Sequence, residues 1–125
     1  MIDLLILLLA QGPATAAPVP ADPAAAAPPA VRAKAKANLA SLVRLYDYPP
    51  RAFERREQGQ VFFELTVGPA GRVTACRVTC SSGSTELDNA TCRIMRKRAR
   101  FVPARDSDGR PVPDTVASSL IWRQF

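Results

Sequence analysis

The chain has 125 residues, a length that suits one domain and is too short for two. Lys and Arg total 17 and Asp and Glu total 11, which gives a net charge of +6, and there is no histidine. Without histidine, a Ser-His or Cys-His dyad and a Cys₂His₂ zinc site are excluded, and the three cysteines are too few for a Cys₄ site. We therefore expect no metal and no cofactor.

The N-terminus begins MIDLLILLLA, in which Leu4 to Ala10 form a continuous apolar run. A membrane-spanning helix needs about twenty apolar residues, so this run has the length of a signal-peptide core instead. Ala14-Thr15-Ala16 matches an A-x-A cleavage site, although Asp3 takes the place of the usual basic residues. We interpret residues 1–16 as a signal-peptide-like segment and expect export to the periplasm. The alternatives are an uncleaved apolar N-terminus and a misplaced start.

Residues 17–37 are interpreted as a linker rich in Pro and Ala. Six of the twelve prolines lie between Pro13 and Pro29, interleaved with alanines. Such a composition favours extended polyproline-II conformations and supplies no core. The segment VRAKAKANLASLVRL, from Val31 to Leu45, overlaps its end and is compatible with a helix. Leu39, Leu42 and Val43 have helical spacing there and are candidates for docking on the domain.

Residues 38–125 carry the patterns of one folded domain. Pro49 and Pro50 suit the start of a short helix, RAFERREQ, which Gly59 ends. VFFELTV (61–67) and RVTACRVTC (72–80) are strands, and the short turn between them predicts an antiparallel hairpin. After the break SSGS, a helix ELDNATCRIMRKRAR, a loop RDSDGRPVP and a last strand TVASSLIWRQF (115–125) follow.

The long helix has a cap and one apolar side. Ser84 or Thr85 can cap it, and the acidic residues Glu86 and Asp88 suit its first turn. Its apolar side comprises Leu87, Thr91, Ile94 and Met95. The order helix, strand, strand, helix, strand predicts an α+β fold. It would have a three-stranded antiparallel sheet packed against one long helix, plus a short N-terminal helix.

All three cysteines lie within CRVTCSSGSTELDNATC, at positions 76, 80 and 92. If strand and helix are antiparallel neighbours, Cys92 lies roughly 10 Å along the helix and Cys76 roughly 13 Å back along the strand from Cys80. These levels nearly match, whereas Cys80 lies about 10 Å from the level of Cys92. The spacing thus favours a Cys76–Cys92 disulfide, with Cys80 left over. The alternative is three reduced thiols in a cytoplasmic protein.

Short motifs follow one another in a characteristic order along about residues 46–124, nearly the whole folded part. They include Gly59 before the first strand, Gly71-x-Val73 and Gly109-x-Pro111-Val112. The other residues of the set are Tyr48, Pro49, Ser82, Gly83, Leu87, Asp88, Phe101 and Pro103. This ordered set resembles the carboxy-terminal domain of the TonB energy-transducer family.

The resemblance implies a fold like the one expected above and a function in energy-dependent transport across the outer membrane. In this family the domain captures an extended segment of an outer-membrane receptor, which adds to the exposed edge of the last strand. Alternation places Val116, Leu120 and Trp122 on the core face of that strand, so the backbone and outward residues would carry the binding. The implied binding edge comprises Val116, Ala117, Ser118, Ser119, Leu120, Ile121, Trp122 and Arg123.

Two departures from the family argue against coupling to an inner-membrane motor. Coupled members have a full anchor helix with a functional histidine, and this sequence has neither; its linker is also short. The alternative function is a standalone periplasmic domain that binds peptides, cell wall or partner proteins, with no energy-coupling role. A homodimer through the same edge is compatible with either function.

Three other functions are disfavoured. The basic run RIMRKRAR fits a solvated helix end, where cations are favoured, better than a nucleic-acid site. Counted from Asp106, DSDG has Pro111 and Ala117 where a calcium-binding EF-hand loop needs Gly and Glu, so it is interpreted as a turn. No acid–base pair or activated nucleophile is visible, so we expect a non-enzyme.

Overall fold

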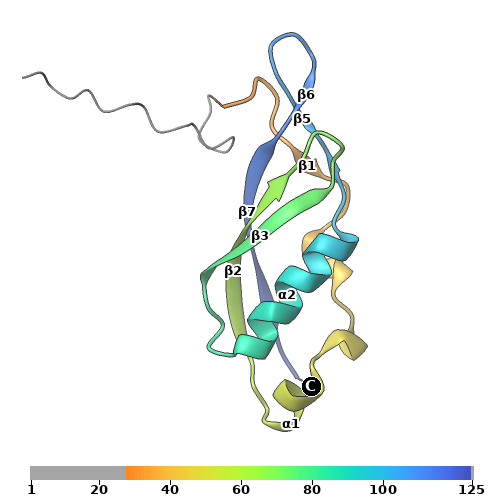
Figure 1. Ribbon diagram of the computed structural model, residues 1–125. Helices are drawn as coiled ribbons and strands as arrows, with labels where there is room; N and C mark the ends of the chain where they lie inside the picture. The colour runs from red at the N-terminus through yellow and green to blue at the C-terminus, as the bar shows by residue number, and fades with distance from the viewer. Residues whose placement is uncertain (1–27, 125) are drawn as a thin grey trace, which may run out of the picture.

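Three strands form one antiparallel sheet with the order β3-β2-β7 in the computed structural model, which describes residues 28–124 (Figure 1). The strands are β2 (Gly59–Val67), β3 (Val73–Cys80) and β7 (Asp114–Trp122). Helix α2 (Thr85–Arg98) packs across one face of this sheet, and the short helix α1 (Pro50–Glu54) lies at one end. The predicted α+β class, with its three-stranded antiparallel sheet and one long helix, is confirmed.

The core lies between the sheet and α2. Alternate residues of β2 point into it, because successive side chains of a strand point to opposite faces. Val61, Phe63, Leu65 and Val67 are all buried. Helix α2 contributes the predicted apolar side and one further residue: Leu87, Ala90, Thr91, Ile94 and Met95.

Helix α2 begins where the sequence predicted its cap. The Ser84 hydroxyl accepts a hydrogen bond from the Leu87 N–H at 3.2 Å, and it donates one to Glu57 at 2.6 Å. The Asp88 carboxylate accepts hydrogen bonds from the Ser82 N–H and both serine hydroxyls of the preceding loop, Ser81 and Ser82. This arrangement explains why Ser82 and Asp88 occur together: they fix the loop against the first turn of α2.

Helix α1 is shorter than the predicted segment 51–58, because the chain closes a Schellman motif after Glu54. The Arg56 N–H donates to the Phe53 carbonyl, and the Glu57 N–H donates to the Ala52 carbonyl. Arg56 takes the left-handed conformation that this motif requires, with φ of 56°. This helix end was not predictable from the sequence, because glycine normally occupies the left-handed position and here an arginine does.

The expected helix across Val31 to Leu45 is wrong. This segment forms the short strand β1 (Lys34–Ala35), which pairs with β4 (Phe101–Val102), and two 3₁₀ helices, Leu39–Leu42 and Leu45–Asp47. Leu39 is buried, and Leu42 and Val43 pack against the core, as their spacing indicated. We name residues 31–48 the arm.

The predicted loop before the last strand contains two short paired strands, β5 (Ala104–Arg105) and β6 (Pro111–Val112). In the turn between them, one oxygen of the Asp106 carboxylate accepts hydrogen bonds from the Asp108 and Arg110 N–H groups, each at 2.9 Å. The Asp106 carboxylate of DSDG therefore stabilises a hairpin turn, in agreement with the turn that the sequence predicted.

A disulfide joins β3 to α2. It links Cys76 and Cys92, whose Cα atoms are 5.5 Å apart, and leaves Cys80 as an exposed free thiol. The predicted pairing is confirmed. It fixes the helix to an outer strand of the sheet, on the side away from β7.

Candidate functional site

The two outer strands of the sheet differ in regularity. Strand β7 pairs with β2 in an unbroken register from Gly59–Trp122 to Val67–Asp114. Strand β3 pairs with the other side of β2, but the register shifts at both ends, beside Thr74 and Thr79. Bulges of this kind make an edge a poor template for a further strand, whereas a regular edge accepts one.

Among the described residues, no strand pairs with the outer side of β7. In an antiparallel strand, every second residue directs both its N–H and its C=O away from the existing partner. These groups form a row that an extended chain could complete. At the start of the strand the row is already in use, because the Arg32 guanidinium donates to the Thr115 carbonyl at 3.0 Å. The open part of the edge therefore begins after Thr115.

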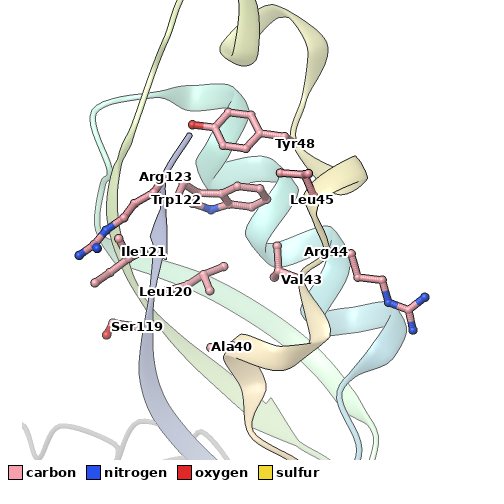
Figure 2. A pocket seen from close by; sticks show the side chains of 10 residues that line it. All are labelled: Ala40, Val43, Arg44, Leu45, Tyr48, Ser119, Leu120, Ile121, Trp122 and Arg123. Carbon is pink, nitrogen blue, oxygen red and sulfur yellow. The ribbon is translucent and has the colours of Figure 1, made fainter. Parts of the chain in front are cut away.

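The arm forms a wall opposite this edge, and a pocket of about 420 Å³ separates them (Figure 2). The side chains of Leu120 and Trp122 point from β7 toward the arm, and Ser119, Ile121 and Arg123 point the other way. The arm contributes Ala40, Val43, Arg44, Leu45 and Tyr48. Leu45 is 68% exposed on the arm, and Ile121 is 49% exposed on the side of β7 that faces away from the arm, so apolar surface remains uncovered on either side of the strand.

Aromatic side chains form the floor at one end of the pocket. The Tyr48 ring meets the Trp122 indole edge to face, with centroids 5.2 Å apart, and meets the Phe53 ring in the same way at 5.6 Å. The Tyr48 hydroxyl donates to the Glu57 carbonyl. The indole N–H of Trp122 donates to the Thr91 hydroxyl at 2.9 Å, which ties β7 to α2. These contacts hold the floor in place without any bound partner.

Two carboxylates fix the arm to the domain. Asp114 accepts hydrogen bonds from the Arg32 guanidinium at 2.8 Å and from the Ala33 N–H at 2.9 Å. Asp47 accepts two from the Arg98 guanidinium, at 2.6 and 2.8 Å. Burial raises the pKa of Asp114, but the hydrogen bonds from Arg32 and the backbone outweigh it and lower that pKa overall.

The electrostatic character of the pocket is basic. Arg44 and Arg123 are the charged residues in its lining, and no acidic residue is among them. Among residues 28–124, no cluster of acidic or cysteine side chains is arranged to hold a metal ion. No helix in the same range is long and apolar enough to cross a membrane. The pocket lining is therefore apolar and basic.

The structure brings part of the predicted edge to this pocket. Ser119, Leu120, Ile121, Trp122 and Arg123 line it, whereas Val116, Ala117 and Ser118 lie further along β7. Leu120 and Trp122 are buried and Val116 is half-buried, in keeping with the predicted core face. The arm residues that line the pocket were not predicted from the sequence, because a helix was expected in that segment. The feature that could have indicated them is the spacing of Leu39, Leu42 and Val43, which predicted that the segment docks on the domain.

The motif residues are spread over three places. Tyr48 lines the pocket and Pro49 precedes α1. Ser82, Gly83, Leu87 and Asp88 build the start of α2. Gly71 contacts the Phe101 carbonyl so closely that a Cβ would lie 2.2 Å from its oxygen, and Pro103 is next to this contact.

Comparison with known proteins relates this chain to one protein family and to solved structures. The family model described as the Gram-negative bacterial TonB protein C-terminal matches residues 45–123. This chain belongs to that TonB C-terminal family. The solution NMR structure of the TonB C-terminal domain of Pseudomonas aeruginosa is similar, with 27% identity and a TM-score of 0.51. The match covers 62% of this chain and 76% of that one. No curated protein matches.

Membership supports a TonB-like role in transport, as the motifs predicted. TonB C-terminal domains are non-catalytic, they act in the periplasm of Gram-negative bacteria, and they interact in general with outer-membrane receptors. Residues 1–27 lie outside the described residues, so the signal-peptide-like segment 1–16 and most of the linker 17–37 have no structural description. The arm, however, brings residues 31–37 of that linker onto the TonB-type domain.

Proposed function

We propose that this domain binds an extended segment of an outer-membrane transport receptor, which adds as a fourth strand to the open edge of β7. The observation that carries the proposal is the contrast between the two outer strands: β7 is regular and open, and β3 is bulged near both ends. An added strand can satisfy the outward N–H and C=O groups of β7 without any rearrangement of the sheet.

The pocket beside β7 supports the same proposal, because it provides specificity where the backbone provides affinity. A strand added to β7 would have alternate side chains on the arm side. There they would meet the aromatic and aliphatic floor formed by Leu120, Trp122 and Tyr48. We expect preferred segments to carry an apolar residue at that position.

The experiment is an NMR titration of the ¹⁵N-labelled chain with synthetic peptides from periplasm-facing segments of outer-membrane receptors of the same bacterium. We expect the largest amide shifts at residues 116–123 and 40–48. The control lies within the molecule: amides of β3, the other outer strand, should not shift. Shifts concentrated on β3, or no binding by any receptor segment, would refute the proposal.

A second measurement distinguishes strand addition from capture of side chains alone. Two versions of a binding peptide would carry N-methyl groups on alternate residues, offset by one position. Only one version blocks the N–H groups that face β7, because these occur at every second residue. We expect that version to lose binding and the other to retain it. Equal affinity of the two versions would exclude pairing with the edge.

A second copy of the chain is a competing occupant of the same edge. Two β7 strands could pair across a two-fold axis, because an isologous contact needs only a self-complementary surface. Sedimentation of the chain with and without the receptor peptide tests this. A dimer that the peptide dissociates would mean that both use β7.

A further inference from the structure

Helix α2 carries a row of cations on its solvent side that the proposed β7 function does not use. Arg93, Arg96 and Lys97 are exposed, and Arg100 continues the row beyond the last turn. Positions separated by three, four and seven residues lie on the same side of a helix. The Arg100 guanidinium donates to the Lys97 carbonyl at 3.2 Å, which keeps it against the end of α2.

Strand pairing brings further cations to the same side. Lys34 pairs with Val102, and the Lys36 N–H donates to the Arg100 carbonyl at 2.9 Å. Arg72 pairs with Arg100 across an isolated bridge. Paired residues of antiparallel strands share a face, and here the opposite face holds Phe101 in the core. We name the resulting surface the basic face; it comprises Lys34, Lys36, Arg72, Arg93, Arg96, Lys97 and Arg100.

The charges of the basic face are not balanced within the domain. Among residues 28–124, the ion pairs use Arg32, Arg55, Arg77 and Arg98, and none uses a residue of the basic face. A surface that keeps this many like charges together destabilises itself, unless an anionic partner binds there. The basic face shares no residue with the pocket beside β7.

The arrangement of the basic face fits an extended anionic surface better than one peptide or a nucleic acid. Its residues come from β1 and the residue after it, the residue before β3, helix α2 and the segment leading into β4, so they spread over the surface and do not follow one groove. It contains no aromatic side chain on which a nucleic-acid base could stack. Val102 lies among the cations with 47% of its surface exposed, an apolar side chain suited to the headgroup region of a bilayer.

We propose that the basic face docks the domain on a membrane of anionic phospholipids. Clusters of four to eight Lys and Arg bind such surfaces, and each cation strengthens binding by about fivefold. The disulfide between Cys76 and Cys92 fixes α2 to β3, which keeps the cations of the helix beside Arg72. Docking through this face would leave β7 and its pocket free for a partner.

The test is sedimentation of the full chain with vesicles of phosphatidylcholine alone or with one third phosphatidylglycerol. The variant R93Q/R96Q/K97Q removes three charges from the basic face. The matched control R51Q/R55Q/R56Q removes three exposed arginines at α1. All three proteins keep the apolar residues 4–10, so insertion of that segment contributes equally to each. Circular dichroism and β7 peptide binding would verify that the variants are folded.

We expect the unchanged chain to bind the anionic vesicles, to bind the neutral vesicles far more weakly, and to release when salt is raised. The basic-face variant should lose on the order of 100-fold in affinity for anionic vesicles, and the control should lose less than about tenfold. Equal losses in the two variants would mean that only net charge matters and would overturn the proposal. Absence of binding to anionic vesicles, or equal binding to both kinds, would also overturn it. Tight binding of duplex DNA or an acidic peptide by this face, without vesicle binding, would assign it to a different partner.

Discussion

The indole N–H of Trp122 donates a hydrogen bond to the hydroxyl of Thr91, 2.9 Å away, and both residues are buried. That hydroxyl in turn donates to the Leu87 carbonyl at 2.8 Å. A buried strand residue and a buried helix residue thus satisfy each other's polar atoms in the core. This bond positions the indole that forms the floor of the pocket beside β7.

Thr91→Val keeps the shape of the side chain and removes the acceptor. The Trp122 N–H is then buried without a partner, which should lower the free energy of unfolding by about 1–3 kcal/mol. Trp122→Phe in the Thr91→Val background should cost less than Trp122→Phe alone, because in that background the indole N–H has already lost its acceptor and its removal breaks no hydrogen bond. Urea denaturation of the four proteins measures the coupling. A coupling energy of zero would mean that the hydrogen bond contributes nothing.

Removal of the disulfide should destabilise the domain through the unfolded chain. The bond closes a loop with a sequence separation of 16 residues, for which loop-closure entropy gives about 3 kcal/mol. We expect Cys76→Ser/Cys92→Ser to lower the free energy of unfolding by about that amount. Cys80→Ser is the control, since Cys80 is an exposed free thiol, and it should change little. The measurement is urea denaturation without reductant. Equal stability of the double variant and the unchanged, disulfide-bonded chain would contradict the prediction.

Arg56 is a site where a single change should stabilise the domain. Its φ of 56° is costly for a residue with a Cβ, and glycine adopts it freely. We expect Arg56→Gly to raise the free energy of unfolding by up to about 1 kcal/mol. Arg55→Gly is the matched control: with φ of −84° at the helix end it relieves no strain, so it should be neutral or destabilising. Thermal unfolding that ranks the two variants in the opposite order would refute the Schellman interpretation.

Gly71 and Gly109 have nearly the same backbone angle, with φ of 81° and 80°, but different surroundings. A Cβ at Gly71 would lie 2.2 Å from the Phe101 carbonyl oxygen, whereas nothing lies within 4 Å of one at Gly109. Gly109→Ala should therefore cost only the strain of the conformation, about 1 kcal/mol. Gly71→Ala adds displacement of backbone next to buried Phe101 and should cost more than about 2 kcal/mol. Chemical denaturation measures both losses in the free energy of unfolding. Equal losses would show that the close contact with the Phe101 carbonyl does not add to the cost at Gly71.

The Asp47–Arg98 pair should make the stability of the arm depend on pH. The hydrogen bonds from Arg98 lower the pKa of Asp47, and this outweighs its burial, which acts in the opposite direction. A lowered carboxyl pKa gives stability that is present above the unfolded value of about 3.9 and is lost as pH falls through the folded value. Asp47→Asn should be less stable at neutral pH and should lose less stability on acidification.

The measurement for this pair is the urea midpoint at several pH values from neutral to strongly acidic. Asp108→Asn, an exposed carboxylate in the turn between β5 and β6, serves as the control and should follow the unchanged chain. Asp114 and Asp88 also have lowered pKa values and remain in both variants, so some acid sensitivity should persist. If the urea midpoint of Asp47→Asn falls with pH in parallel with that of the unchanged chain, Asp47 does not contribute to the pH dependence of stability.

The sequence by itself determined the order of the main elements, the helix cap, the disulfide and the family. These features are local or periodic. Alternation along residues 61–67 records which side chains are buried, and Ser84 satisfies an N–H only three residues away. The Cys76–Cys92 pairing followed from the rise per residue of a strand and a helix joined by a short loop.

Only the tertiary structure decided the sheet order, the regularity of the two edges and the course of the arm. Alternation indicates which face of a strand is buried but not which strands are its neighbours, so it could not predict that β2 lies in the centre of the sheet. That the last strand lies at an edge was inferred from the family resemblance alone. Between Val31 and Tyr48, contacts far away in sequence outweigh helical spacing. Asp114 binds Arg32 and Ala33, and Arg98 binds Asp47 and the Leu42 carbonyl. A segment fixed at several points to distant partners takes the path that those partners impose.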